Sequence, residues 1–180
     1  MVTPIRQPVA VPDASQVSFE ELYERHRHSV YRWARRYCGA DPAEAEDLTQ
    51  EVFIKLLGCM TEIEAERAGA WLYRVTANLA ISRGRARRAL LNRLSRLLFA
   101  VPPPADPADT IEARDELTRA LEVLGRLPPR ERVIINMKLV DGLNQLQIAA
   151  ALGLSQGYVS KLLTRATARL RDHGCEVADD

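Results

Sequence analysis

Cysteine and histidine, on which most disulfide frameworks and metal sites depend, are scarce in this sequence. The 180 residues include three of each. Cys38, Cys59 and Cys175 are widely spaced and form no CxxC pair, so we expect no disulfide framework. His173 and Cys175 could supply two metal ligands, but nothing nearby completes a site. We therefore predict that the protein binds no metal and no cofactor.

Signatures of catalysis are missing too. His26, His28 and His173 have no evident nucleophile or carboxylate partner with which to form a catalytic set. No glycine-rich loop of the kind that cradles phosphate groups is present. We therefore expect a protein that is not an enzyme.

Long apolar runs are absent as well. The N-terminus has Arg6 but lacks the apolar core of about 7–15 residues that a signal peptide needs. No uninterrupted run approaches the ~20 apolar residues that span a bilayer. With 47% hydrophobic and 27% charged residues, the composition is typical of a soluble globular chain. We expect a cytoplasmic protein.

The net charge is small, but the charges are segregated along the chain. The formal net charge is +1, yet residues 41–51 hold five acids and no base, and residues 83–96 hold six arginines and no acid. A second basic run consists of Lys161, Arg165, Arg169 and Arg171. Such segregation predicts two partners of opposite charge, one basic and one polyanionic.

Strand patterns are also absent, because period-two alternation is not found outside the tails. Apolar spacings of three and four predict helices instead. Ser18 can cap the first helix, and Asp41 with Pro42 forms the N-cap and first position of the second. The predicted buried stripes are Phe19, Leu22, His26, Val30, Trp33 and Tyr37 in the first helix and Ala45, Leu48, Val52 and Leu56 in the second.

A third helix is predicted from Ala70 to Arg88, and it can continue through "LLNRLSRLLFA". One side carries Trp71, Leu72, Val75 and Leu79. Steps of four, seven and three place a polar and cationic set along one other side, namely Arg74, Asn78, Arg85 and Arg88. The sequence therefore predicts a helix with an aromatic anchor and a cationic surface.

Four prolines and no glycine in "VPPPADPAD" (101–109) predict a semi-extended linker. We predict an all-α protein of two small helical domains, each with a modest core, joined by this proline-rich linker. The predicted ranges are a disordered tail at 1–17, a first domain at 18–96, the linker at 97–111, a second domain at 112–173 and a tail at 174–180.

The second domain carries a helix-turn-helix signature in "NQLQIAAALGLSQGYVSKLLTRA". Asn144 and Gln147 form a capping-box pattern, Ala149 permits a close helix crossing, and Gly153 permits the tight turn. An ordinary αα-hairpin would use the same glycine and leucines, but it would not need a basic exposed face on its second helix. We predict that Ser160, Lys161, Thr164 and Arg165 enter a DNA major groove, while Gln156 and Tyr158 lie near phosphates.

The acidic helix places Asp47, Gln50, Glu51 and Ile54 on one stripe beside its buried residues. A run of charge is most often a solvated face. Apolar Phe53 and Ile54 beside the carboxylates favour a docking site for a basic helix instead.

In this order, "AEDLTQEVFIKLL", "AWLYRVTANLAI" with its arginine tail, and "LPPRERVIINMKLVDGLNQLQIAAALGLSQGYVSKLLTRATARL" resemble the extracytoplasmic-function (ECF) sigma factors of bacterial RNA polymerase. The resemblance covers about 18–88 and 115–171. It implies an alternative sigma factor whose partners are core RNA polymerase (the β′ clamp helices and the β flap), promoter DNA and, in some members, an anti-sigma factor.

The resemblance also implies site residues. Asp47, Gln50, Glu51 and Phe53 would bind core polymerase. The −10 element would be met by Ile63, Arg74, Asn78, Arg85 and Arg88, with Asn78 and the loop at 61–69 forming a pocket for a flipped base. The −35 element would be read by Gln156, Tyr158, Ser160, Lys161, Thr164 and Arg165.

Several positions depart from the family pattern. Ile63 stands where an aromatic residue is common, Ser160 and Leu162 stand where arginine is common, and Gln147 replaces an acid. Two alternative interpretations remain at this point. The chain could be a helix-turn-helix repressor or activator that acts without polymerase, or "RARRALLNRLSRLLF" could form a basic membrane-surface helix. The apolar part of that segment could equally contact an anti-sigma factor, join the two domains, or extend the helix.

Overall fold

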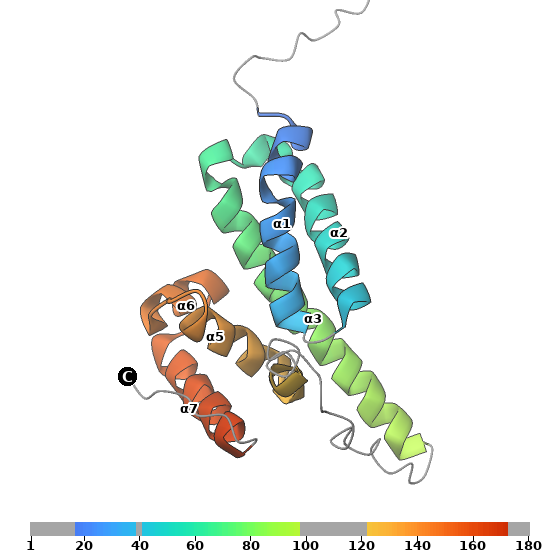
Figure 1. Cartoon of the computed structure of the whole chain (residues 1–180), viewed down its shortest axis with the longest axis vertical. Helices are drawn as coiled ribbons and strands as arrows, with labels where there is room; N and C mark the ends of the chain where they lie inside the picture. Colours follow the sequence, from blue (N-terminus) through green and yellow to red (C-terminus); the bar gives the residue numbers. More distant parts are fainter. Residues whose placement is uncertain (1–16, 39–40, 98–121, 173–180) are drawn as a thin grey trace, which may run out of the picture.

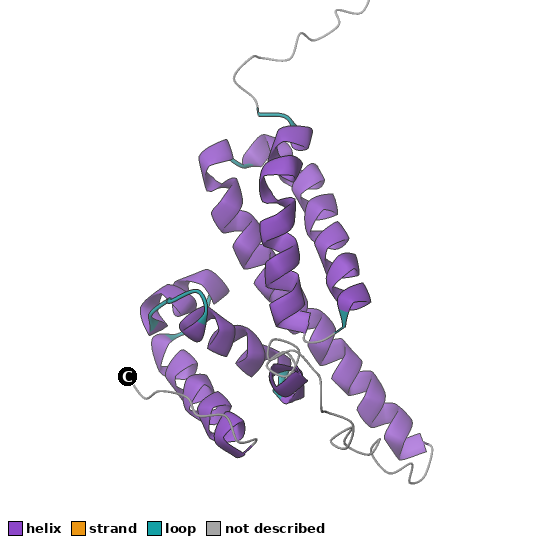
Figure 2. Ribbon diagram, viewed as in Figure 1, coloured by secondary structure: helices purple, strands orange, loops and turns teal. Residues whose placement is uncertain are grey.

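The computed structural model describes residues 17–38, 41–97 and 122–172, without the side chains of 94–97. All regular elements in these ranges are helices, as predicted (Figures 1 and 2). They are α1 (Phe19–Cys38), α2 (Pro42–Cys59), the short 3-10 helices η1 (Met60–Glu62) and η2 (Ala65–Arg67), α3 (Ala68–Leu97), α5 (Pro129–Leu139), α6 (Gln145–Leu152) and α7 (Gln156–Asp172). Residues 122–126 are helical as well. The predicted tails and the linker lie outside the described residues, apart from Val17 and the backbone of Leu97, which ends α3.

Local capping explains where the first two helices begin. The Ser18 hydroxyl accepts a hydrogen bond from the Glu21 amide at 3.2 Å, and the Glu21 carboxylate accepts one from the Ser18 amide at 3.1 Å. This reciprocal pair satisfies two amides that the helix itself leaves free. At α2, the Asp41 carboxylate accepts from the amides of Ala43 and Glu44, and Pro42 occupies the first turn. Both predicted starts are confirmed.

The first domain is a three-helix bundle of α1, α2 and α3 (Figure 1). All four predicted core positions of α2 are fully buried. In α1, Leu22, Val30 and Tyr37 are buried, whereas Phe19, His26 and Trp33 are half-buried because they lie at the edge of the stripe. Periodicity therefore identified the correct face of each helix.

Helix α3 is longer than the bundle that it helps to form. It begins at Ala68, two residues before the predicted start, and its C-terminal half projects beyond α1 and α2 (Figure 1). Leu90 and Leu91 are exposed on this projection. The apolar segment after Arg88 was predicted to contact an anti-sigma factor, to join the two domains or to extend the helix. The described residues show the last of these, because α3 continues to Leu97.

The second domain contains the predicted helix-turn-helix. The capping box of Asn144 and Gln147 is present, with both hydrogen bonds at 2.9 Å. Gly153 ends α6 in the left-handed conformation, with φ of 65°. The Ser155 hydroxyl then accepts from the Tyr158 amide at 3.3 Å and starts α7. Ile148, Ala149, Val159 and Leu162 are buried between the helices, as predicted.

The turn at Gly153 provides a stability test. A Cβ atom at this position would meet nothing within 4 Å, so Gly153→Ala adds backbone strain without a clash. We expect the variant to lose about 1–2 kcal/mol of unfolding free energy, because a residue with a Cβ atom is strained by about this amount in the left-handed region. Urea denaturation measures the change.

Gly157→Ala is the matched control, because its Cβ would also lie in open space but the residue is in helical conformation. Alanine favours a helix over glycine by up to ~1 kcal/mol, so this variant should be neutral or stabilised. Equal destabilisation of both variants would contradict the role given to Gly153.

The cores of the two domains are partly continuous, which the sequence did not indicate. One cluster of buried residues in the first domain contains Leu22, Val52, Phe53, Leu56 and Leu72. The larger cluster is continuous from Tyr37, Leu48 and Ile81 of the first domain to Leu127, Ile134 and Leu162 of the second. The apolar faces of α1, α3 and α5 meet, because α1 and α3 each contact α5.

Candidate nucleic-acid interface

The exposed face of α7 carries the residues predicted to read DNA. Gln156, Lys161, Thr164 and Arg165 are exposed, and Tyr158 is exposed as well. Ser160 is half-buried, and its carbonyl accepts a hydrogen bond from the Thr164 hydroxyl at 3.1 Å. Packing of Val159, Leu162 and Leu163 into the core turns this polar face outward. The arrangement suits insertion of α7 into a major groove.

Sequence reasoning missed Arg130 as part of this surface. Its guanidinium donates a hydrogen bond to the Tyr158 hydroxyl at 3.2 Å and lies 5.8 Å from the centre of the Tyr158 ring. A cation from α5 is thereby held beside the start of α7, where phosphates were predicted to bind. The sequence did carry a signal for Arg130, because it is a basic residue in the first turn of a predicted helix, where the helix dipole disfavours positive charge.

Arg169 does not act as a free cation of the α7 surface. Its Nε lies 3.1 Å from a carboxylate oxygen of Glu131, whose side chain is almost completely buried in α5. A buried carboxylate needs such a partner, because an unpaired charge in the interior is costly. Arg169 therefore lies on the exposed face, but Glu131 compensates its charge, and Lys161 and Arg165 remain as cations of that face.

The acidic surface of α2 that is available to a partner is smaller than predicted, because one of its carboxylates is paired within the chain. Asp47 and Gln50 are exposed, and Ile54 and Leu57 beside them have exposed fractions of 69% and 60%. Glu51, by contrast, forms an ion pair of 2.6 Å with Arg83 of α3. Arg83 also donates to the carbonyl of Asp47 at 3.3 Å. The free part of this surface is an acidic and apolar stripe centred on Asp47, Gln50 and Ile54.

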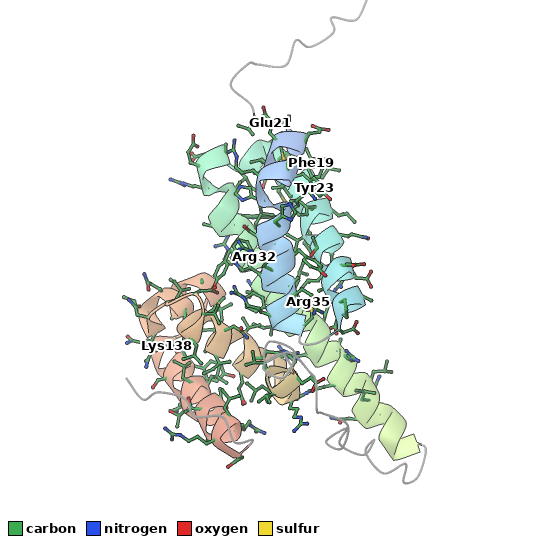
Figure 3. All side chains as sticks on the ribbon, viewed as in Figure 1. Phe19, Glu21, Tyr23, Arg32, Arg35 and Lys138 are labelled. Atoms are coloured by element: carbon green, nitrogen blue, oxygen red, sulfur yellow. The ribbon has the colours of Figure 1, made fainter. Side chains whose placement is uncertain are left out.

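Phe53 was predicted to bind a partner, and the structure contradicts this. Its side chain is only 4% exposed. It forms edge-to-face contacts with the rings of Phe19, at 6.4 Å, and Tyr23, at 4.7 Å (Figure 3 labels both at the start of α1). The aromatic cluster places Phe53 in the bundle core, because α1 covers the face of α2 on which it lies.

Acidic α2 and the arginine-rich half of α3 partly neutralise each other. Arg83 pairs with Glu51 at 2.6 Å and Arg87 pairs with Glu44 at 2.7 Å. Arg74, Asn78, Arg85 and Arg88 are exposed, as predicted. Arg88 donates to the carbonyl of Arg126 at 3.3 Å. The prediction of two separate charged partners is therefore too simple, because part of each charge block satisfies the other.

The loop at 61–69 helps to form a cavity, although not with the predicted partner. A cavity of about 720 Å³ is lined by Ile63 and Arg67 of this region, by Trp71 and Arg74 of α3, and by Gln147 of α6. Asn78 lies one helical turn beyond Arg74 and is not among the lining residues, so the predicted pairing of Asn78 with this loop is not found. Trp71 is half-buried and contributes to the cavity wall as well as to the core.

Within the described ranges, no group of three or more His, Cys, Asp or Glu side chains could hold a metal ion. His173 and Cys175 lie outside those ranges. Burial raises the pKa of the Cys38 thiol to about 12, which keeps it protonated and unreactive near neutral pH. Across residues 17–38, 41–97 and 122–172, no helix is both long enough and apolar enough to cross a membrane.

Comparisons with known proteins identify both domains. Residues 22–90 match the family described as Sigma-70 region 2, and residues 123–172 match Sigma-70, region 4. These two ranges lie inside the two domains predicted from the sequence.

Known proteins are similar in sequence over most of this chain. The ECF RNA polymerase sigma factor SigE of Mycolicibacterium smegmatis is 33% identical over 165 residues, which cover 89% of this chain and 63% of that relative. The RNA polymerase sigma-E factor of Streptomyces coelicolor is 32% identical over 157 residues, which cover 87% of this chain and 85% of that relative.

Solved structures share the fold. Sigma factor RpoE from Bartonella quintana, in complex with the anti-sigma factor NepR, aligns with a TM-score of 0.60 at 22% identity and covers 86% of this chain and 94% of its own. CnrH, in complex with the cytosolic domain of CnrY, aligns with a TM-score of 0.54 at 26% identity and covers 86% of each chain. The chain therefore belongs to the ECF family of sigma factors, alternative sigma factors that direct promoter recognition by RNA polymerase.

Proposed function

We propose that this chain binds core RNA polymerase through the exposed stripe of α2, contacts the −10 element through α3 and the 61–69 loop, and reads the −35 element through α7. One observation carries the proposal. The two domains expose surfaces of opposite character, an acidic and apolar stripe at Asp47, Gln50 and Ile54 and a basic polar face at Lys161 and Arg165. A protein that bridges a basic protein surface and DNA requires both.

The −10 surface is proposed to consist of the exposed residues Arg74, Asn78, Arg85 and Arg88 together with Ile63. Arginines would hold phosphates, and the Asn78 amide would hydrogen-bond an unpaired base. The −35 surface is proposed to consist of the predicted α7 residues with Arg130 added. As a regulatory subunit, the chain would act in the cytoplasm without catalytic chemistry of its own.

The β′ clamp helices are the proposed contact of α2, and the β flap is the proposed contact of the second domain. An anti-sigma factor is a further proposed partner, since the structures of RpoE and CnrH contain NepR and CnrY respectively. These assignments extend family membership to individual surfaces of this chain.

Pull-down with core RNA polymerase, followed by runoff transcription on a genomic library, tests the proposal. We expect the chain to co-purify with core enzyme and to start transcripts from a restricted set of promoters. A helix-turn-helix repressor or activator would instead bind its sites tightly as a dimer without core enzyme. Tight DNA binding by the chain alone, with no capture of core enzyme, would overturn the proposal.

A further inference from the structure

A second cavity, of about 340 Å³, lies where α3 meets the start of α5. It shares no lining residue with the cavity at the 61–69 loop. The end of α1, the start of α2 and the helical residues 122–126 complete its wall. Its charged lining residues are Asp41, Glu44, Arg87, Arg88 and Arg132. Cations therefore outnumber acids around this cavity.

Arg132 is the most buried of these cations. The residue is only 8% exposed, and its Nη1 donates to the carbonyl of Gly125 at 3.2 Å. Its Nε is buried without a hydrogen-bond partner, and among the described residues the guanidinium forms no ion pair. Burial lowers the pKa of Arg132, because its positive charge is poorly solvated. Arginine nevertheless stays charged in proteins, so the chain holds an interior cation that no carboxylate compensates in the described ranges.

Gly84 brings this cation of α5 close to the cations of α3. A Cβ atom at position 84 would lie 2.5 Å from the Pro129 ring and 3.8 Å from Nη2 of Arg132. Glycine thus lets the first turn of α5 approach α3 so closely that Arg132 shares a cavity with Arg87 and Arg88. Helix α5 also begins without a side-chain cap, so its free amides and its dipole add positive potential at this end.

The two acids of the cavity are already engaged within the chain. The Asp41 carboxylate accepts hydrogen bonds from amides in the first turn of α2. The Glu44 carboxylate pairs with Arg87 at 2.7 Å. Arg88 donates to a backbone carbonyl at 3.3 Å rather than to an acid. Only Arg87 therefore has an acidic partner, and an anion of higher charge can compete with that partner.

We propose that this cavity binds a diphosphate group, with Arg132 at its floor and Arg87 and Arg88 at its mouth. A guanidinium can donate two parallel hydrogen bonds to the oxygens of one phosphoryl group. A diphosphate offers one such group to the buried arginine and one to the exposed arginines, whereas a single carboxylate compensates only one cation. The volume is near the lower end of the range for small-ligand sites, about 300–1,000 Å³.

Two substitutions at the cavity should change the affinity in opposite directions. Arg87→Gln removes a cation and leaves Glu44 unpaired beside the ligand. Glu44→Gln removes the competing carboxylate and frees Arg87, and a gain of affinity cannot come from damaged folding. Arg25→Gln on α1 and Glu46→Gln on α2 are the matched controls, because they make the same charge changes at exposed sites outside the cavity.

Isothermal titration of the free full-length chain with sodium pyrophosphate, at constant ionic strength, measures the affinity. We expect one site per chain, with binding about tenfold or more weaker in Arg87→Gln, several-fold tighter in Glu44→Gln and unchanged in the controls. Inorganic phosphate should bind about tenfold more weakly than pyrophosphate, because it reaches fewer of the arginines. A parallel titration with adenosine diphosphate shows whether the group is preferred free or as part of a nucleotide.

The location of the bound anion is a separate readout. In amide NMR spectra, pyrophosphate should shift the resonances of Gly84, Gly125 and Arg132 more than those of α7. Largest shifts on α7 would place the anion on the DNA-reading helix and overturn the proposed site. Absence of saturable binding in both the parent and Glu44→Gln would overturn it too, as would equal losses in Arg87→Gln and Arg25→Gln. Because neither polymerase nor DNA is present, these results do not depend on the proposed function.

Discussion

Asp47→Lys should lower the affinity of the chain for core RNA polymerase by about a hundredfold, ~3 kcal/mol, because it sets like charges against each other in a desolvated contact. Asp47 is exposed on α2, and its side chain has no ion pair among the described residues. The change should therefore leave the bundle folded. Titration of labelled chain with core enzyme measures the affinity, and circular dichroism checks the helix content.

The neighbouring carboxylate is a poorer choice for this test. Glu51 holds Arg83 at 2.6 Å, so Glu51→Lys would place two cations together inside the first domain and weaken its packing. Glu20→Lys is a better control, because it makes the same charge reversal at an exposed site on α1. Equal affinity of Asp47→Lys and parent, with intact helicity, would remove α2 from the proposed interface.

Arg165→Ala should cost about 1–3 kcal/mol in promoter binding by the holoenzyme and relax sequence preference only at the −35 element. Arg165 is exposed on α7, and its planar guanidinium can donate two hydrogen bonds to one guanine edge. Competition binding on promoter fragments with altered −35 sequences measures the effect. Arg25→Ala, which removes one exposed cation from α1, should leave promoter binding nearly unchanged.

Asn78→Ala should separate duplex recognition from strand opening. Asn78 is exposed on α3 of the first domain. Its side-chain amide can form the proposed hydrogen bonds with a base only after that base has left its base pair. We expect permanganate footprinting to show less opening of the −10 element by Asn78→Ala, and full rescue on a pre-melted promoter. Pre-melting should not rescue Arg165→Ala to the same degree. Equal rescue of both variants would show that the two domains do not divide the work in this way.

Features that depend on short segments could be predicted from the sequence. The caps at Ser18, Asp41 and Asn144 and the left-handed Gly153 each involve groups within about four residues, so their chemistry is visible locally. The order of the three motifs was likewise enough to indicate the family. Apolar periodicity identified which face of each helix is buried, because helical geometry alone decides which side chains share a face.

Contacts between distant segments could not be predicted in the same way. Periodicity shows that a face is apolar but does not name the surface that covers it, and so Phe53 was placed on a partner-binding face that α1 in fact covers. Charge blocks likewise do not show whether their partners lie in the same chain. Arg83 meets Glu51 and Arg169 meets Glu131 only because the helices pack at particular positions.

By itself, then, the sequence determined the helices, their starts and turns, the helix-turn-helix and the family, since these follow from local hydrogen bonding, backbone geometry and spacing. Only the tertiary structure decided which charges remain free, that the two domains share a core, and that Asp141 meets Arg36 and Tyr73 across the domain interface. The physical reason is that such contacts depend on how whole apolar faces pack together, and that packing brings together groups as far apart as 105 positions in the chain.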